Sequence, residues 1–215
     1  MPFSPKKRYE LKDLAFKKIN PRHDSCIGSF ESFQEDLVEY LKEDALHSQN
    51  LCIANTFLVF DKFNLESFRQ KKEKLALLRY VSILTDSLRL DSELKVHFRN
   101  KDIHYNSLPA LKIGRLCVDD KYRGSSIGKC IIAWIIDRAY YLNQNVACRF
   151  ITLDAKRHQG KDKDSYGFYK KCNFQVLKTK NKTDLEIAEQ KSGQTPMYLD
   201  VYYITRKGKN LDLKG

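Results

Sequence analysis

The clearest chemical signal is the segment RGSSIG at residues 123–128, which stands between two apolar stretches. Glycine and serine let the backbone turn tightly, so successive N–H groups can point into one concavity. The flanking stretches, LKIGRLCVD at 111–119 and KCIIAWIIDRAYYL at 129–142, predict a buried strand and a largely buried helix. Free N–H groups at a helix N-terminus carry partial positive charge, which suits a phosphate or a pyrophosphate. Such a turn can also simply join a strand to a helix.

Other common sites are excluded by spacing. No G-K-[ST] follows the turn, so it is not a Walker loop, and the absence of G-x-G-x-x-G excludes the dinucleotide-binding fingerprint. The six cysteines contain no C-x-x-C pair and the five histidines no H-x-x-x-H pair, so we expect no metal site. Most of the cysteines lie in or beside apolar runs and are expected to act as small hydrophobic side chains.

The elements that must position this turn alternate between helix and strand. An apolar stripe of Phe33, Leu37, Leu41 and Ala45 predicts an amphipathic helix over 29–47, which Ser32 and Glu35 could begin with a capping box. A further helix is expected at 165–173. The polar stretch 64–74 predicts a short helix or a loop, and the charged stretch 88–107 predicts a helix-like connection. Expected strands beyond 111–119 are 54–62, 75–87, 147–155, 174–178 and 197–204. This order predicts one α/β domain over residues 1–215, with a core at about 26–204.

The basic charge is concentrated at the two ends of the chain. The formal net charge is +12; residues 1–24 contribute +4 and residues 156–215 contribute +7, whereas the middle is nearly neutral. Two basic ends on one face would attract a polyanion, and a merely solvated surface is the alternative. No apolar run reaches the roughly 18 residues of a membrane span and no signal peptide is evident, so we expect a soluble, cytoplasmic protein without membrane contact.

The turn and its surroundings resemble the GNAT superfamily of N-acetyltransferases. Arg123 and Gly128 match the ends of that family's R/Q-x-x-G-x-G/A motif, while Ser126 stands where glycine is usual, although serine favours negative φ. CRFITLDA at 148–155 resembles the family's next strand, and SYGFYKKCNF at 165–174 resembles its F-Y-x-x-x-G-F segment, with Asn173 in place of glycine. The resemblance is specific over about 108–176 and plausible from Cys26 to Tyr203. The early helix and the strand that follows it fit a bacterial subgroup that includes aminoacyl-tRNA-acetylating toxins.

The resemblance implies a fold, a cofactor and a set of binding residues. The fold would be a mixed, mostly antiparallel sheet with splayed central strands and flanking helices. Acetyl-CoA (coenzyme A) would bind in the splay and pass its acetyl group to a primary amine that attacks the thioester directly. By their position in the resembled motif, Leu116, Cys117 and Val118 would bind the pantetheine arm. The pyrophosphate falls to the loop, chiefly to its N–H groups; the loop residues are Arg123, Gly124, Ser125, Ser126, Ile127, Gly128 and Lys129.

Tyr169 matches the family's general acid, which would protonate the leaving thiolate. Tyr166, three residues earlier on the same expected helix, is a lesser candidate, and packing alone would also account for Tyr169. No base can be named, since Asp86 and Glu93 are equally well explained as surface carboxylates.

The acceptor stays open between several amines. An aminoacyl-tRNA is favoured by the net charge and by the toxin-like first half, and its α-amine needs less deprotonation than an alkylamine does. A small amine or a protein amine is the alternative. An inactive GNAT-fold module that binds coenzyme A or nucleic acid is another, and a homodimer is compatible with each.

Overall fold

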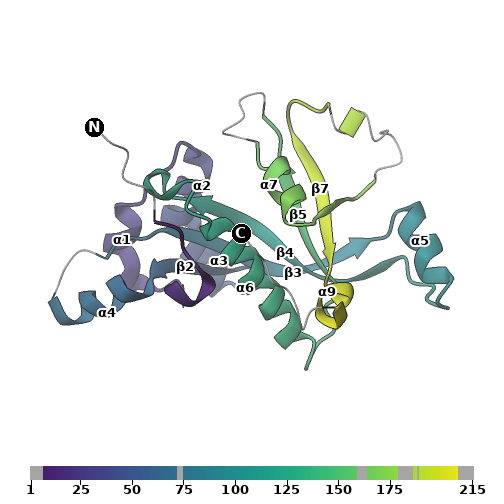
Figure 1. The fold of residues 1–215 in the computed structure, drawn as a ribbon, viewed down its shortest axis with the longest axis horizontal. Helices are drawn as coiled ribbons and strands as arrows, with labels where there is room; N and C mark the ends of the chain where they lie inside the picture. The colour runs from purple at the N-terminus through teal and green to yellow at the C-terminus, as the bar shows by residue number, and fades with distance from the viewer. Residues whose placement is uncertain (1–6, 72–74, 159–163, 179–185, 188, 208–215) are drawn as a thin grey trace. The chain divides into compact units, whose positions relative to one another are not determined.

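The computed structural model describes residues 7–71, 75–158, 164–178, 186–187 and 189–207. Within these residues, seven strands form one sheet in the order β1-β2-β3-β4-β5-β7-β6 (Figure 1). The pairs β1–β2, β2–β3, β5–β7 and β6–β7 are antiparallel. The predicted fold class, a mixed α/β fold with a mostly antiparallel sheet and flanking helices, is therefore confirmed. The strands are β1 (Leu14–Lys18), β2 (Asn55–Asp61), β3 (Arg79–Arg89), β4 (Ser107–Val118), β5 (Phe150–Lys156), β6 (Gln175–Val176) and β7 (Gln194–Asp200).

The helices of the described residues are mostly short. The longest, α6 (Ile127–Leu142), follows β4 after the one-turn 3₁₀ helix η4 (Asp120–Tyr122). The other α-helices are α1 (Asp24–Gly28), α2 (Glu35–Glu39), α3 (Ala45–Asn50), α4 (Lys62–Lys71), α5 (Ser92–Arg99), α7 (Tyr166–Lys171) and α9 (Val201–Lys207). Two more 3₁₀ turns, η1 (Leu11–Asp13) and η2 (Pro21–His23), precede α1, and the π-helical turn η3 (Tyr40–Asp44) joins α2 to α3.

The chain divides into two compact units. Unit 1 comprises residues 1–84 and 113–135, and unit 2 comprises residues 85–112 and 136–215. Strands β3 and β4 and helix α6 contribute residues to both units, and each unit has its own core.

The core of unit 1 has aromatic and aliphatic side chains on both faces of β2. On one face, Leu58 and Phe60 are fully buried in a cluster that includes Leu41 and Ala45 of the predicted apolar stripe. On the other face, Trp134 of α6 stacks on Phe16 with ring centroids 4.4 Å apart and meets the edge of Phe57 at 4.8 Å. Neighbouring residues of a strand point to opposite faces, so these contacts place α1–α3 and α6 on opposite sides of β2.

The core of unit 2 is built around Phe150 on β5. Its ring meets Phe98 of α5 and Tyr198 of β7 edge to face, at centroid distances of 6.1 and 5.5 Å. Helix α7 lies beside β5 (Figure 1). Aromatic pairs in this geometry stabilise beyond the area they bury, so they fix the register of β5 against β7.

Three local predictions were wrong. The helix expected over 29–47 begins only at Glu35, runs on to Asn50 and contains a π turn; its N-cap is Gln34, without a side-chain cap, so the capping box does not form. The last strand was expected to run to 204, but β7 ends at Asp200, whose carboxylate accepts from the backbone N–H of Tyr202 and starts α9. Strand β1 was not expected at all.

Asp61, at the end of β2, gives unit 1 a pH-dependent contribution to stability. Its buried carboxylate accepts hydrogen bonds from Lys7 Nζ at 2.5 Å and from the backbone N–H of Phe63 at 3.0 Å. Burial alone would raise the pKa of Asp61, but the Lys7 hydrogen bond and the backbone amides outweigh it and lower that pKa. The stabilisation is therefore present above the unfolded-state pKa of about 4 and is lost as pH falls through the lower, folded-state value.

We expect Asp61→Asn to reduce the free energy of unfolding by about 1–2 kcal/mol at pH 7, because a charge-assisted pair and a strong acceptor are lost. In urea titrations the difference from the native chain should shrink as pH falls below 4. Glu10→Gln is the control, because the Glu10–Lys12 pair is exposed and should change little. A difference that stays constant with pH would contradict this account.

Candidate active site

Two consecutive aspartates hold the turn that leads from β4 into α6. The buried carboxylate of Asp119 accepts from the backbone N–H of Glu31 at 3.2 Å and of Lys121 at 3.0 Å. Asp120 accepts from the backbone N–H of Phe33 at 2.8 Å and from Arg123 Nε at 2.6 Å. The turn is thereby tied to the segment before α2, some 90 residues earlier in the chain.

Arg123, the first residue of the predicted motif, is committed to this framework. Its guanidinium pairs with Asp120 and lies 3.8 Å from the centre of the Phe33 ring. A planar guanidinium can satisfy a carboxylate and stack on an aromatic face at the same time. In this geometry the side chain fastens the loop to the segment before α2.

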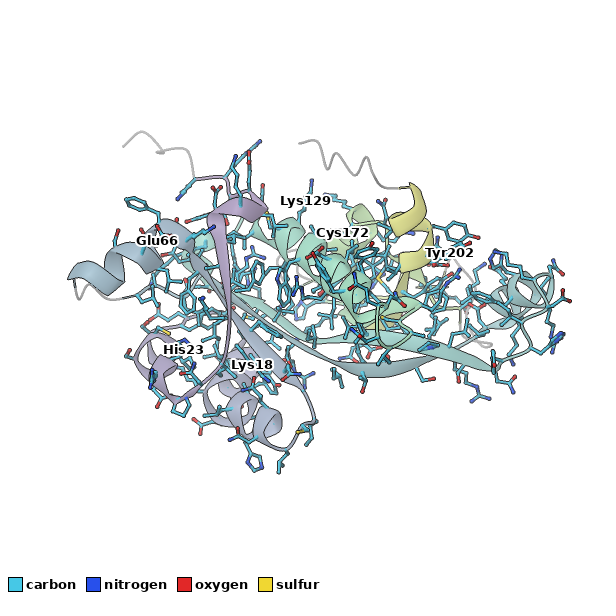
Figure 2. All side chains as sticks on the ribbon, turned by 90° about the horizontal axis from the view of Figure 1, so that it is seen from below. Lys18, His23, Glu66, Lys129, Cys172 and Tyr202 are labelled. Atoms are coloured by element: carbon cyan, nitrogen blue, oxygen red, sulfur yellow. The ribbon has the colours of Figure 1, made fainter. Side chains whose placement is uncertain are left out.

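Residues 124–128 present a row of backbone donors. Within the described part of the chain, none of their five N–H groups donates a hydrogen bond, whereas the Ser126 carbonyl already accepts from the backbone N–H of Lys129 at 3.1 Å and of Cys130 at 3.4 Å. The row runs into the first turn of α6, where the helix dipole adds positive potential. Lys129, exposed on that turn, adds a full charge (Figure 2). These groups fit a pyrophosphate, which offers several anionic oxygens to successive donors.

The loop owes its shape to backbone in the left-handed region. Gly124 has φ +79° and Ser126 has φ +63°. Asn173, the other residue that replaces a glycine of the resembled motifs, also has positive φ, +66°. Both substituted residues therefore keep the backbone that glycine would adopt, and Ser126 does so despite the expected preference of serine for negative φ. The buried Ser125 hydroxyl closes the turn from inside by donating to the Tyr122 carbonyl.

On β4, the three predicted pantetheine-binding residues differ in burial. Cys117 is 1% exposed, belongs to the core of unit 1, and has a thiol pKa raised by burial. It packs as a small hydrophobic side chain, as expected for most of the cysteines. Leu116 and Val118 are half-buried and, by strand alternation, point to the opposite face.

An N-terminal arm, residues 7–10, also contacts the loop, and apart from basic charge no sequence pattern predicts this contact. The backbone N–H of Tyr9 donates to the Ser125 carbonyl at 3.2 Å, and Cys130 Sγ donates to the Tyr9 carbonyl at 3.4 Å. Burial and the nearby Asp61 carboxylate raise the pKa of Tyr9 to about 12. The arm therefore fixes the outer edge of the loop from the far end of the sequence.

In unit 2, α7 carries both tyrosines that the sequence singled out. Tyr169 is buried, and its ring meets those of Phe168 and Phe174 edge to face at 5.1 and 5.5 Å. Tyr166 is half-buried instead, and its ring lies 3.9 Å from the guanidinium of Arg157. The two side chains therefore occupy different environments, and Tyr166 is engaged in a cation–π contact.

The two candidate bases also differ. Asp86 Oδ2 accepts from Thr152 Oγ1 at 2.6 Å, a contact between β3 and β5 within unit 2. Glu93 is exposed and pairs with Lys178 Nζ at 2.8 Å, as a surface carboxylate does. Neither contact assigns a proton-transfer role.

The described residues contain neither a metal-binding cluster nor a membrane-spanning helix. No group of three or more His, Cys, Asp or Glu side chains in them could hold a metal ion. Nor does that part of the chain contain a helix with the length and apolar character needed to cross a membrane.

The fold is shared with solved structures, although no protein-family model matches the sequence. A tyrosine-to-phenylalanine mutant of KacT superposes with a TM-score of 0.67 at 16% identity, covering 91% of this chain and 99% of that chain. AtaT complexed with acetyl-methionyl-tRNAfMet gives 0.66 at 15% identity, covering 91% and 99%. AtaTR bound with AcCoA gives 0.65 at 16% identity, covering 91% and 98%. At such identities the likeness shows the fold, and it is the fold that the GNAT resemblance implied.

The left-handed Ser126 predicts a specific effect on stability. Ser126→Gly removes a Cβ from a backbone conformation that costs non-glycine residues about 1–3 kcal/mol, offset by the greater freedom of glycine in the unfolded chain. We expect the free energy of unfolding to rise by about 0.5–1 kcal/mol in chemical denaturation. Ser125→Gly, at the neighbouring residue without positive φ, should instead destabilise because it loses the hydroxyl bond to Tyr122. Equal effects of the two changes would refute the assignment of strain to Ser126.

Proposed function

We propose that this chain is an acetyl-CoA-dependent N-acetyltransferase. The observation that carries the proposal is the row of five N–H groups at residues 124–128, at the start of α6, which donate no hydrogen bond to any of the described residues. The fold supports it, because AtaTR, which shares that fold, has a structure bound with AcCoA. The resemblance of residues 123–128 to the acetyltransferase motif supports the pyrophosphate as the anion for these donors.

The chain's own residues then have separate tasks. Residues 124–128 would hold the pyrophosphate with their N–H groups, helped by the charge of Lys129. The backbone of residues 116–118 would pair with the pantetheine arm. Bound acetyl-CoA would supply the thioester that a neutral amine attacks. Tyr169 would donate its phenolic proton to the departing thiolate, because a phenol and a thiolate have comparable basicity.

For the acceptor we propose the α-amine of an aminoacyl-tRNA. Its pKa lies near or below 8, so a large fraction is neutral and nucleophilic at pH 7 without a strong base. The net charge of +12 favours a polyanion, and AtaT, which shares the fold, is known complexed with acetyl-methionyl-tRNAfMet. Three lysines of the basic C-terminal part are candidates for tRNA contact: Lys178, which pairs with Glu93, and Lys180 and Lys182, which lie outside the described residues. A small amine or a protein amine is the alternative acceptor.

Coenzyme A binding is the first test. Coenzyme A should raise the melting temperature of the native chain, because a ligand that binds only the folded state stabilises it. Gly128→Glu should abolish the increase by placing a carboxylate among the donors meant for the pyrophosphate. Lys121→Glu is the matched control: it adds the same side chain on η4, before the donor row, and should preserve most of the increase. An unchanged melting temperature of the native chain in millimolar coenzyme A would overturn the proposal.

Tyr169→Phe should lower turnover about 10²–10⁴-fold, the usual contribution of a positioned general acid, with coenzyme A affinity preserved. Turnover is measured as transfer of labelled acetyl groups to purified charged tRNA. Tyr166→Phe is the control and should keep most of the activity. If Tyr166→Phe loses activity while Tyr169→Phe retains it, the acid is misassigned. If charged tRNA is never labelled while a polyamine or a protein amine is, the acceptor is wrong and the enzyme class stands.

A further inference from the structure

Arg115 occupies a position on β4 that alternation would assign to an apolar residue. Residues 111, 113 and 117, which point to the same face of the strand, are 6%, 4% and 1% exposed. Arg115 continues this series, yet its side chain is exposed. A single cation therefore interrupts a buried row, two residues before Cys117.

The surroundings of Arg115 are built and held in place. Its guanidinium lies 5.3 Å from the centre of the Tyr40 ring, and Nη1 donates to the carbonyl of its own neighbour, Gly114, at 2.9 Å. Tyr40 begins the π turn η3, and its hydroxyl is hydrogen-bonded to the buried Ser82 hydroxyl on β3 at 3.0 Å. A π turn shifts the helical register, and such turns are frequent at functional sites.

A second tyrosine strengthens this aromatic support. Tyr80 is fully buried on β3, donates to the Leu37 carbonyl at 2.6 Å, and has its ring centroid 6.3 Å from that of Tyr40. Burial raises the pKa of Tyr80 far above its ordinary value, and Arg115 opposes that increase while Asp36 adds to it. Arg115 and Asp36 are thus the charged side chains that act on this cluster from β4 and α2.

No carboxylate pairs with Arg115 in the described part of the chain. Four other arginines there each lie within ion-pair distance of an aspartate: Arg123, Arg138, Arg149 and Arg157. A guanidinium has five N–H donors, and the contacts of Arg115 within the protein occupy one of them. It is therefore a fixed cation with donors available for an oxyanion, and a planar pair of donors matches phosphate or carboxylate geometry.

We propose that Arg115 binds an oxyanion of the acceptor close to its reactive amine, and so selects an anionic acceptor over a polyamine. The proposal rests on the proposed function, which places the pantetheine arm at residues 116–118 of the same strand. Two residues along a strand span about 6.6 Å, so the cation lies within a side chain's reach of the acetyl-transfer position. The phosphodiester of a terminal aminoacyl nucleotide and the carboxylate of a free amino acid share this chemistry.

The test compares ligands that differ only in the oxyanion. The probes are a non-hydrolysable amide analogue of an aminoacyl cytidylyl-adenosine, which has a phosphodiester, and the matching aminoacyl-adenosine analogue, which has none. Calorimetry should show that Arg115→Gln weakens binding of the dinucleotide about 10- to 100-fold, the value of a charge-assisted hydrogen-bonded contact, and leaves aminoacyl-adenosine unchanged. Arg115→Lys should recover part of the loss, since lysine keeps the charge without the planar donors.

Two controls make the result specific. Arg22→Gln removes an exposed arginine of unit 1 and should leave both ligands unchanged. Coenzyme A affinity should be the same in Arg115→Gln as in the native chain, so a failure of coenzyme A binding would count against the proposed function and not against Arg115.

The outcomes separate the sources of the oxyanion. Arg115-dependent binding of a free amino acid, with no preference for the dinucleotide, would assign the cation to a carboxylate and support the oxyanion site. Equal losses for both nucleoside ligands, no loss for any anionic ligand, or tighter polyamine binding by the native chain than by Arg115→Gln would overturn the proposal.

Discussion

The geometry of the candidate site depends on two carboxylates, those of Asp119 and Asp120, which directly follow β4. Asp119 and Asp120 accept hydrogen bonds from the backbone N–H groups of residues 31 and 33, which satisfies these donors before α2. The N–H groups of residues 124–128, in contrast, donate to no other described residue. An unpaired buried donor is costly, and a row of donors can be kept only where water or a ligand reaches it. The aspartates concentrate the unmet hydrogen-bonding capacity of this region in one stretch of five residues. Arg123 pairs with Asp120 and so compensates the negative charge that would otherwise lie beside these donors.

In this arrangement the backbone and the side chains are suited to different binding roles. Backbone donors are fixed by the path of the chain and lose no side-chain entropy on binding, which suits a cofactor common to many enzymes. Side chains that differ from one protein to the next can then recognise the acceptor. In unit 1, Arg115 is exposed beside Tyr40, and the strand alternation of β4 places it on the same face as Cys117, which packs in the core with residues of α1–α3.

How well the sequence predicted the structure varied with the range of the interactions. Helix α6 was predicted because apolar residues cover most of its circumference, which indicates a largely buried helix. Ile127, Ile131 and Ile135 are indeed fully buried. The loop was located correctly, but the positive φ of Ser126 was not predicted, because serine favours negative φ and the loop is also bonded to a residue as distant in sequence as Tyr9. Strand β1 escaped notice because LAFKK has only three apolar residues, and it becomes a strand by pairing with β2.

Two of the errors have an instructive physical basis. The residues VYYI after β7 have strong strand propensity, yet Asp200 caps a helix there, and its side chain also pairs with Arg149. An aspartate before an apolar run is a helix-start signal that β propensity obscured. The π turn at Tyr40, in contrast, has no signature in the local sequence, because the bond between Tyr40 and Ser82 joins residues 42 positions apart.

The contact between the N-terminal arm and the loop has a consequence for the order in which parts of the chain reach their folded positions. Tyr9 precedes its partners, Ser125 and Cys130, by more than a hundred residues in the chain and is therefore synthesised before them. Because the chain emerges from one end only, Tyr9 lacks these two hydrogen-bond partners while β1–β4 are being completed, although Lys7 of the arm can already pair with Asp61 of β2. Closing so long a loop also costs conformational entropy. The hydrogen bonds of the arm can offset this cost only after the turn has formed. The two hydrogen bonds of Tyr9 thus form only after the turn before α6 has been made, and the loop reaches its final shape when residues 7–10 pack against it.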